Sequence, residues 1–180
     1  MSSSCSATGV RVAVCLLLAA CAGEAGSGAD AKGAGDSAHP LMGAPAPKFE
    51  SSSVNGKGKV SISGLNGKVV IVDFWATWCE PCRKSFPKLQ ELNVKYKASG
   101  MQLVGVSEDD DKSGIAEFGS SLSADFPLVW DADKGIAGKW SPGSMPSTFI
   151  VDRSGVVRFV HRGYHDGEEV EIEKELKTLL

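Results

Sequence analysis

Two long apolar runs stand in the middle of the chain. Residues 69–75 read VVIVDFW and residues 101–106 read MQLVGV. Neither run alternates between apolar and polar positions, as a strand with one solvent-facing side would. Runs of this kind, rich in β-branched residues, are typical of strands buried on both faces. They predict two central strands of an α/β sheet.

Helical spacing of apolar residues separates these two runs. The apolar positions recur every three or four residues at Phe86, Leu89, Leu92 and Tyr96, which indicates one buried helix face. Pro81 is compatible with the first turn of this helix, and Gly100 marks its end. A second helix is predicted around residues 115–122 and a short one over residues 134–140.

The remaining elements are two hairpins, a short strand and a last helix. Asn-Gly at residues 55–56 predicts a turn within residues 53–63, and residues 152–155 predict a turn between strands 148–151 and 156–160. Residues 127–130 predict a short strand. The last helix is predicted to open at Asp166 and Glu169, which have capping-box spacing. Its apolar stripe is Ile172, Leu176, Leu179 and Leu180.

This order of elements predicts a central mixed sheet flanked by helices, in which the closing hairpin is antiparallel. Active sites of such sheets gather at the carboxyl ends of the strands. Cys79 lies just after that end of the first buried run. The neighbourhood of Cys79 is therefore where chemistry is expected.

The N-terminal part has a different character. Arg11 precedes a short apolar stretch that ends Leu-Ala-Ala-Cys at Cys21. This resembles the bacterial lipoprotein signal, which predicts a signal peptide over residues 1–20 and a diacylglycerol on the Cys21 thiol. An ordinary signal peptide with a chance cysteine is the alternative. Residues 21–46 are rich in glycine and alanine and predict a flexible tether, and residues 47–180 predict the folded domain.

Charge and hydropathy exclude two classes of partner contact. The chain of 180 residues has a net charge of −3 and no basic block, so a nucleic-acid partner has no electrostatic support. No apolar run reaches the ~18–20 residues that span a bilayer. Membrane association is therefore predicted through the lipid alone.

The cysteines leave one reactive pair. Of the five, Cys5 and Cys15 belong to the predicted signal and Cys21 is predicted to carry lipid. Cys79 and Cys82 remain, too few for a secreted disulfide scaffold. A zinc site needs four ligands, and the histidines are scattered at His39, His161 and His165. We expect no metal and no cofactor, and a cysteine pair that reacts with itself and with visiting molecules.

The stretch 74–82, FWATWCEPC, and the later stretch 143–155, GSMPSTFIVDRSG, together resemble the thioredoxin superfamily. The tether and the N-terminal hairpin are similar to its extracytoplasmic ResA/TlpA group. The resemblance covers roughly residues 44–180. It implies a thioredoxin fold with an N-terminal β-hairpin extension and a thiol-disulfide oxidoreductase activity.

The resemblance also implies roles for three residues in the first stretch. A thiolate at Cys79, at the amino end of a helix, would attack disulfides, and Cys82 would resolve the mixed disulfide. Asp73 falls where thioredoxin places a buried acid. Burial would raise its pKa, so that it could take the proton of Cys82. A structural hydrogen bond from Asp73 to a neighbouring hydroxyl is the alternative.

Other residues of the resemblance surround the pair. Met145-Pro146 matches the cis-proline loop, whose Met145 backbone would pair with a substrate strand. Trp78 would flank the cysteines as an apolar cover, or serve packing alone. Glu80 would oppose thiolate formation at Cys79. Asp109 or Asp110 could supply an acid that this group keeps near the site, and a solvated loop charge is the other interpretation.

The predicted function is a membrane-tethered extracytoplasmic thiol-disulfide oxidoreductase on the periplasmic side of a bacterial membrane. The resemblance implies that it reduces disulfides of exported proteins, apocytochromes c among them, with electrons from a membrane thiol donor. Two other functions stay open. One is a peroxiredoxin-type thiol peroxidase with Thr77 near Cys79, and the other is a non-enzymatic binding module that uses the groove at Pro146.

Overall fold

The two apolar runs form neighbouring parallel strands at the centre of a five-stranded sheet. The computed structural model describes residues 38–180. The strand order is β5–β4–β3–β6–β7. Strands β3, β4 and β5 run parallel to one another, β6 is antiparallel to β3, and β7 is antiparallel to β6. The strands are β3 (Val69–Trp75), β4 (Met101–Ser107), β5 (Leu128–Trp130), β6 (Ser147–Val151) and β7 (Val157–Arg162). The predicted mixed sheet and its antiparallel closing hairpin are confirmed.

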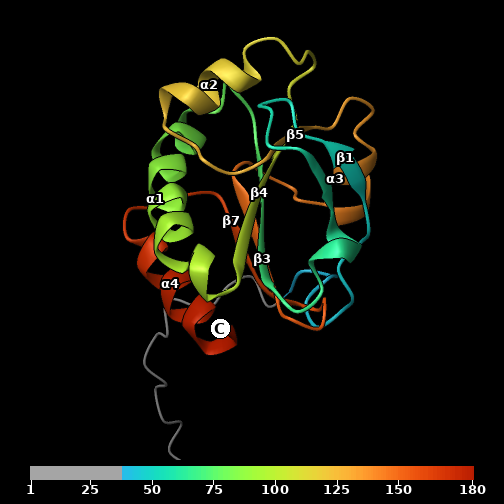
Figure 1. Ribbon diagram of the computed structural model, residues 1–180, viewed down its shortest axis with the longest axis vertical. Helices are drawn as coiled ribbons and strands as arrows, with labels where there is room; N and C mark the ends of the chain where they lie inside the picture. The colour runs from blue at the N-terminus through green and yellow to red at the C-terminus, as the bar shows by residue number, and fades with distance from the viewer. Residues whose placement is uncertain (1–37) are drawn as a thin grey trace, which may run out of the picture. The chain divides into compact units, whose positions relative to one another are not determined.

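Helices cover one face of this sheet, and a hairpin with a short helix covers the other (Figure 1). The first layer contains α1 (Glu80–Tyr96), α2 (Ile115–Ser121) and α4 (Glu168–Leu179), and η2 (Lys97–Ser99) follows α1. The second layer contains β1 (Glu50–Ser52), β2 (Lys59–Ser61), η1 (Ile62–Leu65) and α3 (Gly135–Trp140). The N-terminal hairpin is therefore confirmed as β1 paired with β2.

Alternate residues of β3 belong to the two layers, which explains why its sequence shows no polar alternation. Ile71 and Trp75 pack in the core cluster that includes α1 and α4, whereas Val72 and Phe74 pack in the cluster that includes α3. All seven residues of β3 are buried. Asp73 is at a position of the first set and therefore faces α1 and α4.

The predicted tether is too long at its C-terminal end. His39 is 3% exposed, and its ring lies edge-on to Phe149 with centroids 5.1 Å apart. The amides of Gly43 and Ala46 donate to the carbonyls of Val157 and Gly155. Residues 38–46 therefore belong to the folded domain. Residues 38–46 are attached to the rest of the domain mainly through backbone hydrogen bonds. The pattern of apolar residues in the sequence does not reveal such bonds. Cys21 and the predicted signal and tether up to residue 37 lie outside the described residues.

Two element boundaries also differ from the predictions. Helix α4 begins at Glu168, and its N-cap is Gly167 with a φ of 94° and no side-chain cap, so the predicted capping box at Asp166 is wrong. Glycine is favoured there because a side chain strains a positive φ. Ile62 begins η1, whereas the sequence indicated a strand continuing to residue 63.

Candidate active site

Cys79 and Cys82 form a disulfide at the point where β3 leads into α1. Their sulfur atoms are 1.98 Å apart and their Cα atoms are 5.3 Å apart. Cys79 is the N-cap residue of α1, with an extended backbone, and Pro81 lies in the first turn. Proline fits there because the amide that it lacks has no partner within the helix. The buried strand and the helix start thus fix both sulfurs in one place.

The backbone around Cys79 favours negative charge on its sulfur. The amide of Cys82 donates to Cys79 Sγ at 3.2 Å, and the helix N-terminus adds its positive dipole end. Cys79 is 4% exposed and Cys82 is 0% exposed, so Cys79 is the more accessible sulfur. Glu80 is exposed, and its carboxylate lies 3.9 Å from Arg83. Solvent and the positive charge of Arg83 therefore weaken the repulsion between Glu80 and a Cys79 thiolate. Arg83 was not singled out by the sequence.

Asp73 is fully buried beneath the helical layer. Thr148 Oγ1 donates to Asp73 Oδ1 at 2.8 Å, whereas Asp73 Oδ2 has no hydrogen-bond partner. Burial raises the pKa of Asp73 to about 7, against the Thr148 hydrogen bond, which lowers it; the charge of Glu168 raises it further. A carboxyl group with this pKa can accept or release a proton near neutral pH. The alternative interpretation of Asp73 was a structural hydrogen bond to a neighbouring hydroxyl group, and Thr148 supplies that hydroxyl.

Asp109 is buried and joins the end of β4 to the loop before Cys79. Its carboxylate accepts the Thr77 amide at 3.0 and 3.1 Å, the Thr77 hydroxyl at 2.6 Å and the Ser107 hydroxyl at 2.7 Å. The interpretation of Asp109 as a solvated loop charge is therefore wrong. Asp110 is fully exposed and does fit that interpretation.

We expect Asp109→Ala to loosen the loop that carries Cys79. The substitution leaves the Thr77 amide and two hydroxyls without their acceptor, which costs about 2–4 kcal/mol in the free energy of unfolding. Urea unfolding and hydrogen exchange of the Thr77 amide measure both effects. Asp110→Ala is the matched control, because its side chain is solvated, and it should change stability by less than about 0.5 kcal/mol. Equal effects of the two variants would contradict this role of Asp109.

The residues predicted to meet a substrate lie around the same end of the sheet. The Met145–Pro146 peptide bond is cis, as the resemblance implied, and Pro146 directly precedes β6. Met145 is half-buried against the core cluster that contains both cysteines. Trp78 is 69% exposed, so it does not serve packing alone. Its role toward a substrate stays a prediction.

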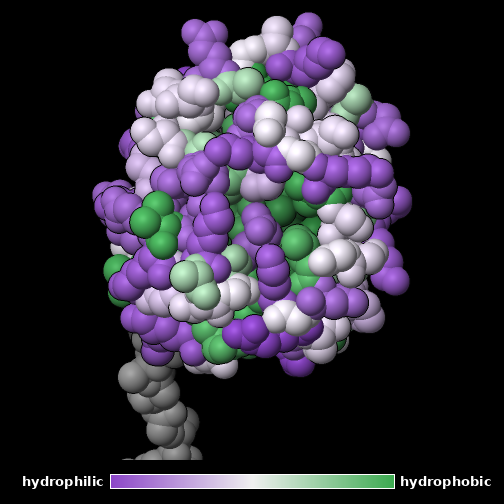
Figure 2. Space-filling view, viewed as in Figure 1, coloured by the Kyte–Doolittle hydropathy of each residue, from purple (hydrophilic) through white to green (hydrophobic). Residues whose placement is uncertain are grey.

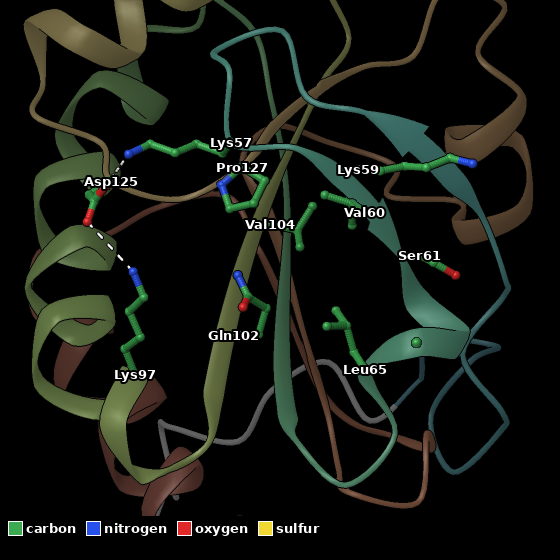
Figure 3. A pocket seen from close by; sticks show the side chains of 11 residues that line it. Lys57, Lys59, Val60, Ser61, Leu65, Lys97, Gln102, Val104, Asp125 and Pro127 are labelled. Carbon is green, nitrogen blue, oxygen red and sulfur yellow. Dashed lines mark hydrogen bonds and ion pairs between the residues drawn. The ribbon is translucent and has the colours of Figure 1, made fainter.

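A hollow of about 390 Å³ lies elsewhere, along the outer edge of β4 where β5 pairs only with Gly105–Ser107. Its apolar floor appears in Figure 2 and its lining in Figure 3. The apolar residues that line it are Val60, Leu65, Val104 and Pro127. Lys57 and Lys97 both pair with Asp125 at one side of the hollow (Figure 3). Lys97 follows the last turn of the 17-residue α1, about 25 Å from Cys79 along the helix. The hollow is therefore separate from the disulfide.

Two observations on the described residues concern metal ligands and membrane-spanning helices. Within residues 38–180, no group of three histidine, cysteine or acidic side chains is placed to hold a metal ion. Among the same residues, no helix combines the length and apolar character that crossing a bilayer requires.

Comparison with known proteins gives concordant results. Residues 42–160 match the model of the AhpC/TSA family. The chain is 35% identical over 115 residues to the thiol-disulfide oxidoreductase ResA of Bacillus subtilis, which covers 64% of each protein. It is 30% identical over 130 residues to ResA of Geobacillus kaustophilus, which covers 72% of this chain and 74% of that protein. The chain thus spans just under two thirds of the Bacillus subtilis relative.

Solved structures agree with these sequence matches. A Chlorobium tepidum protein described as a thiol:disulfide interchange protein DsbE has a TM-score of 0.72 and 33% identity, over 77% of this chain and 96% of that one. A Bacteroides thetaiotaomicron protein described as a protein disulfide isomerase has a TM-score of 0.71 and 28% identity, over 77% and 89%. The thioredoxin-like fold predicted from residues 74–82 and 143–155 is confirmed.

Proposed function

The chain belongs to the AhpC/TSA family. From its similarity to the ResA proteins and to the DsbE structure, we propose that it is a thiol-disulfide oxidoreductase of the ResA type. The observation that carries the proposal is the disulfide between Cys79, the N-cap of α1, and Cys82 one turn later. A four-residue ring adds little to stability by restricting the unfolded chain. A bond of that kind at a helix N-terminus is better suited to reversible exchange.

The geometry supports a two-step exchange in which electrons and protons balance. In the reduced protein, the Cys79 thiolate attacks a substrate disulfide, and one substrate sulfur leaves as a thiolate that takes a proton from water. The Cys82 thiol then gives its proton to Asp73 and attacks Cys79 Sγ. This releases the second substrate thiolate and forms the Cys79–Cys82 disulfide. The substrate disulfide is reduced and the cysteine pair is oxidised.

The substrate class and location extend this proposal. We infer that exported proteins with disulfides are the substrates, apocytochromes c among them, and that a membrane thiol carrier re-reduces the pair. In a compartment that already oxidises cysteines, a dedicated protein is needed to reduce disulfides rather than to form them. Trp78, Met145 and Pro146 would contact the substrate. A lipid on Cys21 would hold the domain at the membrane surface, outside the cytoplasm.

The anchor is testable by itself. Cys21→Ser should move the protein from the membrane pellet to the soluble fraction, because a thioether-linked lipid cannot form on serine. Immunoblots of fractionated cells measure the distribution, and Cys5→Ser in the predicted signal is the matched control. A Cys21→Ser protein that stays in the pellet would refute the lipid anchor.

Catalysed reduction of a protein disulfide tests the activity. The reduced protein should speed the precipitation of insulin by dithiothreitol and consume hydrogen peroxide no faster than dithiothreitol alone. The opposite pattern would favour the thiol peroxidase. In that enzyme class, Thr77 and an arginine would have to surround the Cys79 sulfur, whereas the Thr77 hydroxyl donates to Asp109 and Arg83 donates to the Thr77 carbonyl. Binding of an exported protein that persists in Cys79→Ala, together with no insulin reduction by the wild type, would favour the binding module.

A further inference from the structure

A row of polar residues crosses the helical face of the sheet at the level of Asp73. The register places Asp73 of β3 opposite Thr148 of β6, and Thr148 opposite His161 of β7. Neighbouring strands are about 5 Å apart, so the row extends about 10 Å from Asp73 to His161. Since the three residues are directly opposite one another, their side chains point to the same face, towards α1 and α4.

His161 ends this row between two carboxyl groups of α4. Its Nε2 lies 2.6 Å from Glu175 Oε2, and its Nδ1 lies 3.7 Å from Glu168 Oε1. His161 and Glu168 are each 5% exposed. The short contact with Glu175 fixes the ring orientation, which in turn turns Nδ1 towards Glu168. Glu168 is thus a buried acid whose position is set by a buried imidazole.

The charged groups around this cluster come from β3, from β7, from the segment before α4 and from α4 itself. From β3 comes Asp73, from β7 comes His161, and from the segment before α4 comes His165, whose Nδ1 is 3.9 Å from Glu168. Glu169, Glu171 and Glu175 are the other acids of α4 that face Glu168 or His161. The charged neighbour that acts on Asp73 is therefore an acid, Glu168, and not a lysine or arginine.

We propose that Glu168, oriented by His161, is a positioning residue of the exchange site that strengthens the Asp73 carboxylate as a base towards the Cys82 thiol. The proposal rests on the exchange reaction given above, in which Asp73 receives the Cys82 proton. A negative Glu168 disfavours a second negative charge at Asp73. When Asp73 does ionise, the same repulsion makes it a stronger base towards the Cys82 thiol.

The physical consequence has a definite sign. Burial raises the pKa of Glu168, and the charges of His161 and His165 lower it, so the two histidines favour the ionised Glu168 that acts on Asp73. Neutralising Glu168 removes the repulsion and should lower the pKa of Asp73. Asp73 would then be available as a base at lower pH, although it would be a weaker one.

Glu168→Gln tests this directly. We expect the Asp73 carboxyl carbon, followed by NMR in the oxidised protein, to titrate roughly half a pH unit lower than in the wild type. The pH dependence of mixed-disulfide resolution should move in the same direction. At pH 6 about threefold more Asp73 would be ionised, because half a unit is a factor of about three. A purely structural role of Glu168 would change the melting temperature and leave both titrations unmoved.

Glu171→Gln is the matched control on the same helix. Glu171 is also an acid and contacts His165 at 3.9 Å, but it is not among the groups that act on Asp73. Glu171→Gln should shift the Asp73 titration by less than about 0.2 pH units, because the Glu171 side chain is 33% exposed and its charge is screened more than that of buried Glu168. In the Asp73→Asn background, Glu168→Gln should no longer move the pH dependence of resolution.

The outcomes separate this proposal from the function beneath it. An unchanged Asp73 titration in folded Glu168→Gln would overturn the role of Glu168 and leave the exchange activity standing. Failure of the wild type to reduce insulin would overturn the proposed function, and this role with it. If Glu168→Gln does not fold, the titration curves of Asp73 and Glu168 in the wild type test the coupling instead. Two coupled carboxyl groups each show an inflection at the other's midpoint. Two independent curves would refute the coupling.

Discussion

Serine in place of Cys79 is expected to abolish disulfide exchange. The hydroxyl group is not ionised near neutral pH, so the helix N-terminus has no thiolate to stabilise and the first attack cannot occur. We expect the rate of insulin reduction to fall by at least about 10³-fold, to the level of dithiothreitol alone. Stopped-flow or turbidity assays with equal protein concentrations measure the loss.

Cys82→Ser is the matched variant, because it removes the other sulfur of the same bond. Cys79 remains a nucleophile in this variant, but no second thiol releases the substrate. Mixed disulfides should therefore accumulate and appear on non-reducing gels as adducts, which dithiothreitol cleaves by reduction. These adducts also identify the natural substrates. If iodoacetamide labelled both cysteines of the reduced wild type at equal rates, the assigned order of attack would be wrong.

Asp73→Asn is expected to slow resolution and to stabilise the fold. Without the carboxylate, Cys82 loses the base that takes its proton, and general-base catalysis contributes about 100-fold or more. Resolution of the mixed disulfide at pH 7 should slow by about that factor. Quenched-flow trapping of the adduct follows this step separately from the first attack. Unchanged resolution across pH 5–9 would show that Asp73 has a structural role only.

The stability effect of the same variant depends on pH, and its sign follows from the raised pKa of Asp73. The folded protein holds this proton up to about pH 7, whereas the ordinary pKa of an aspartate carboxyl group, which applies to the unfolded chain, is 3.8. The free energy of unfolding therefore falls as pH rises from about 4 to 7, by up to about 4 kcal/mol for a shift of about three units. Asparagine removes this dependence. Its advantage in urea unfolding should be absent at pH 4, grow to pH 7 and then level off.

Thr148→Val is the control for this stability measurement. It removes the hydrogen bond to Asp73 Oδ1 without removing the acid. Since that bond lowers the pKa of Asp73, the variant should extend the falling part of the stability curve to higher pH. A curve that ends at the same pH as in the wild type would argue against this account of Asp73.

Local sequence was sufficient for the strands and the reactive pair. Residues 69–75 are buried on both sides and carry no alternation, so their composition alone indicates a central strand. Cys79 and Cys82 follow that strand directly, so no long-range information is needed to place them at its end. The helix after them is indicated by the spacing of Phe86, Leu89 and Leu92, and all three are buried.

Residues whose role depends on strand register could not be identified in this way. Asp109 stands within the run Glu-Asp-Asp-Asp at 108–111, and only the end of β4 determines which acid turns inward to Thr77. Thr148 lies 75 residues after Asp73 and pairs with it across β3 and β6, and His161 lies 13 residues after Thr148 and pairs with it across β6 and β7. The start of α4 was misplaced because Asp166 and Glu169 satisfy a local rule that Gly167 overrides.

The contacts of residues 38–46 define how short a stable version of this protein can be. A shortened chain that starts at residue 47, where the composition changes, would lack the contact between the rings of His39 and Phe149. It would also lack the backbone hydrogen bonds from residues 43 and 46 to Val157 and Gly155. The carbonyl of Ser141, which lies 3.1 Å from His39 Nε2, would also lose this partner only five residues before Pro146. Recombinant versions for crystallisation or enzymology should therefore begin at or before residue 38.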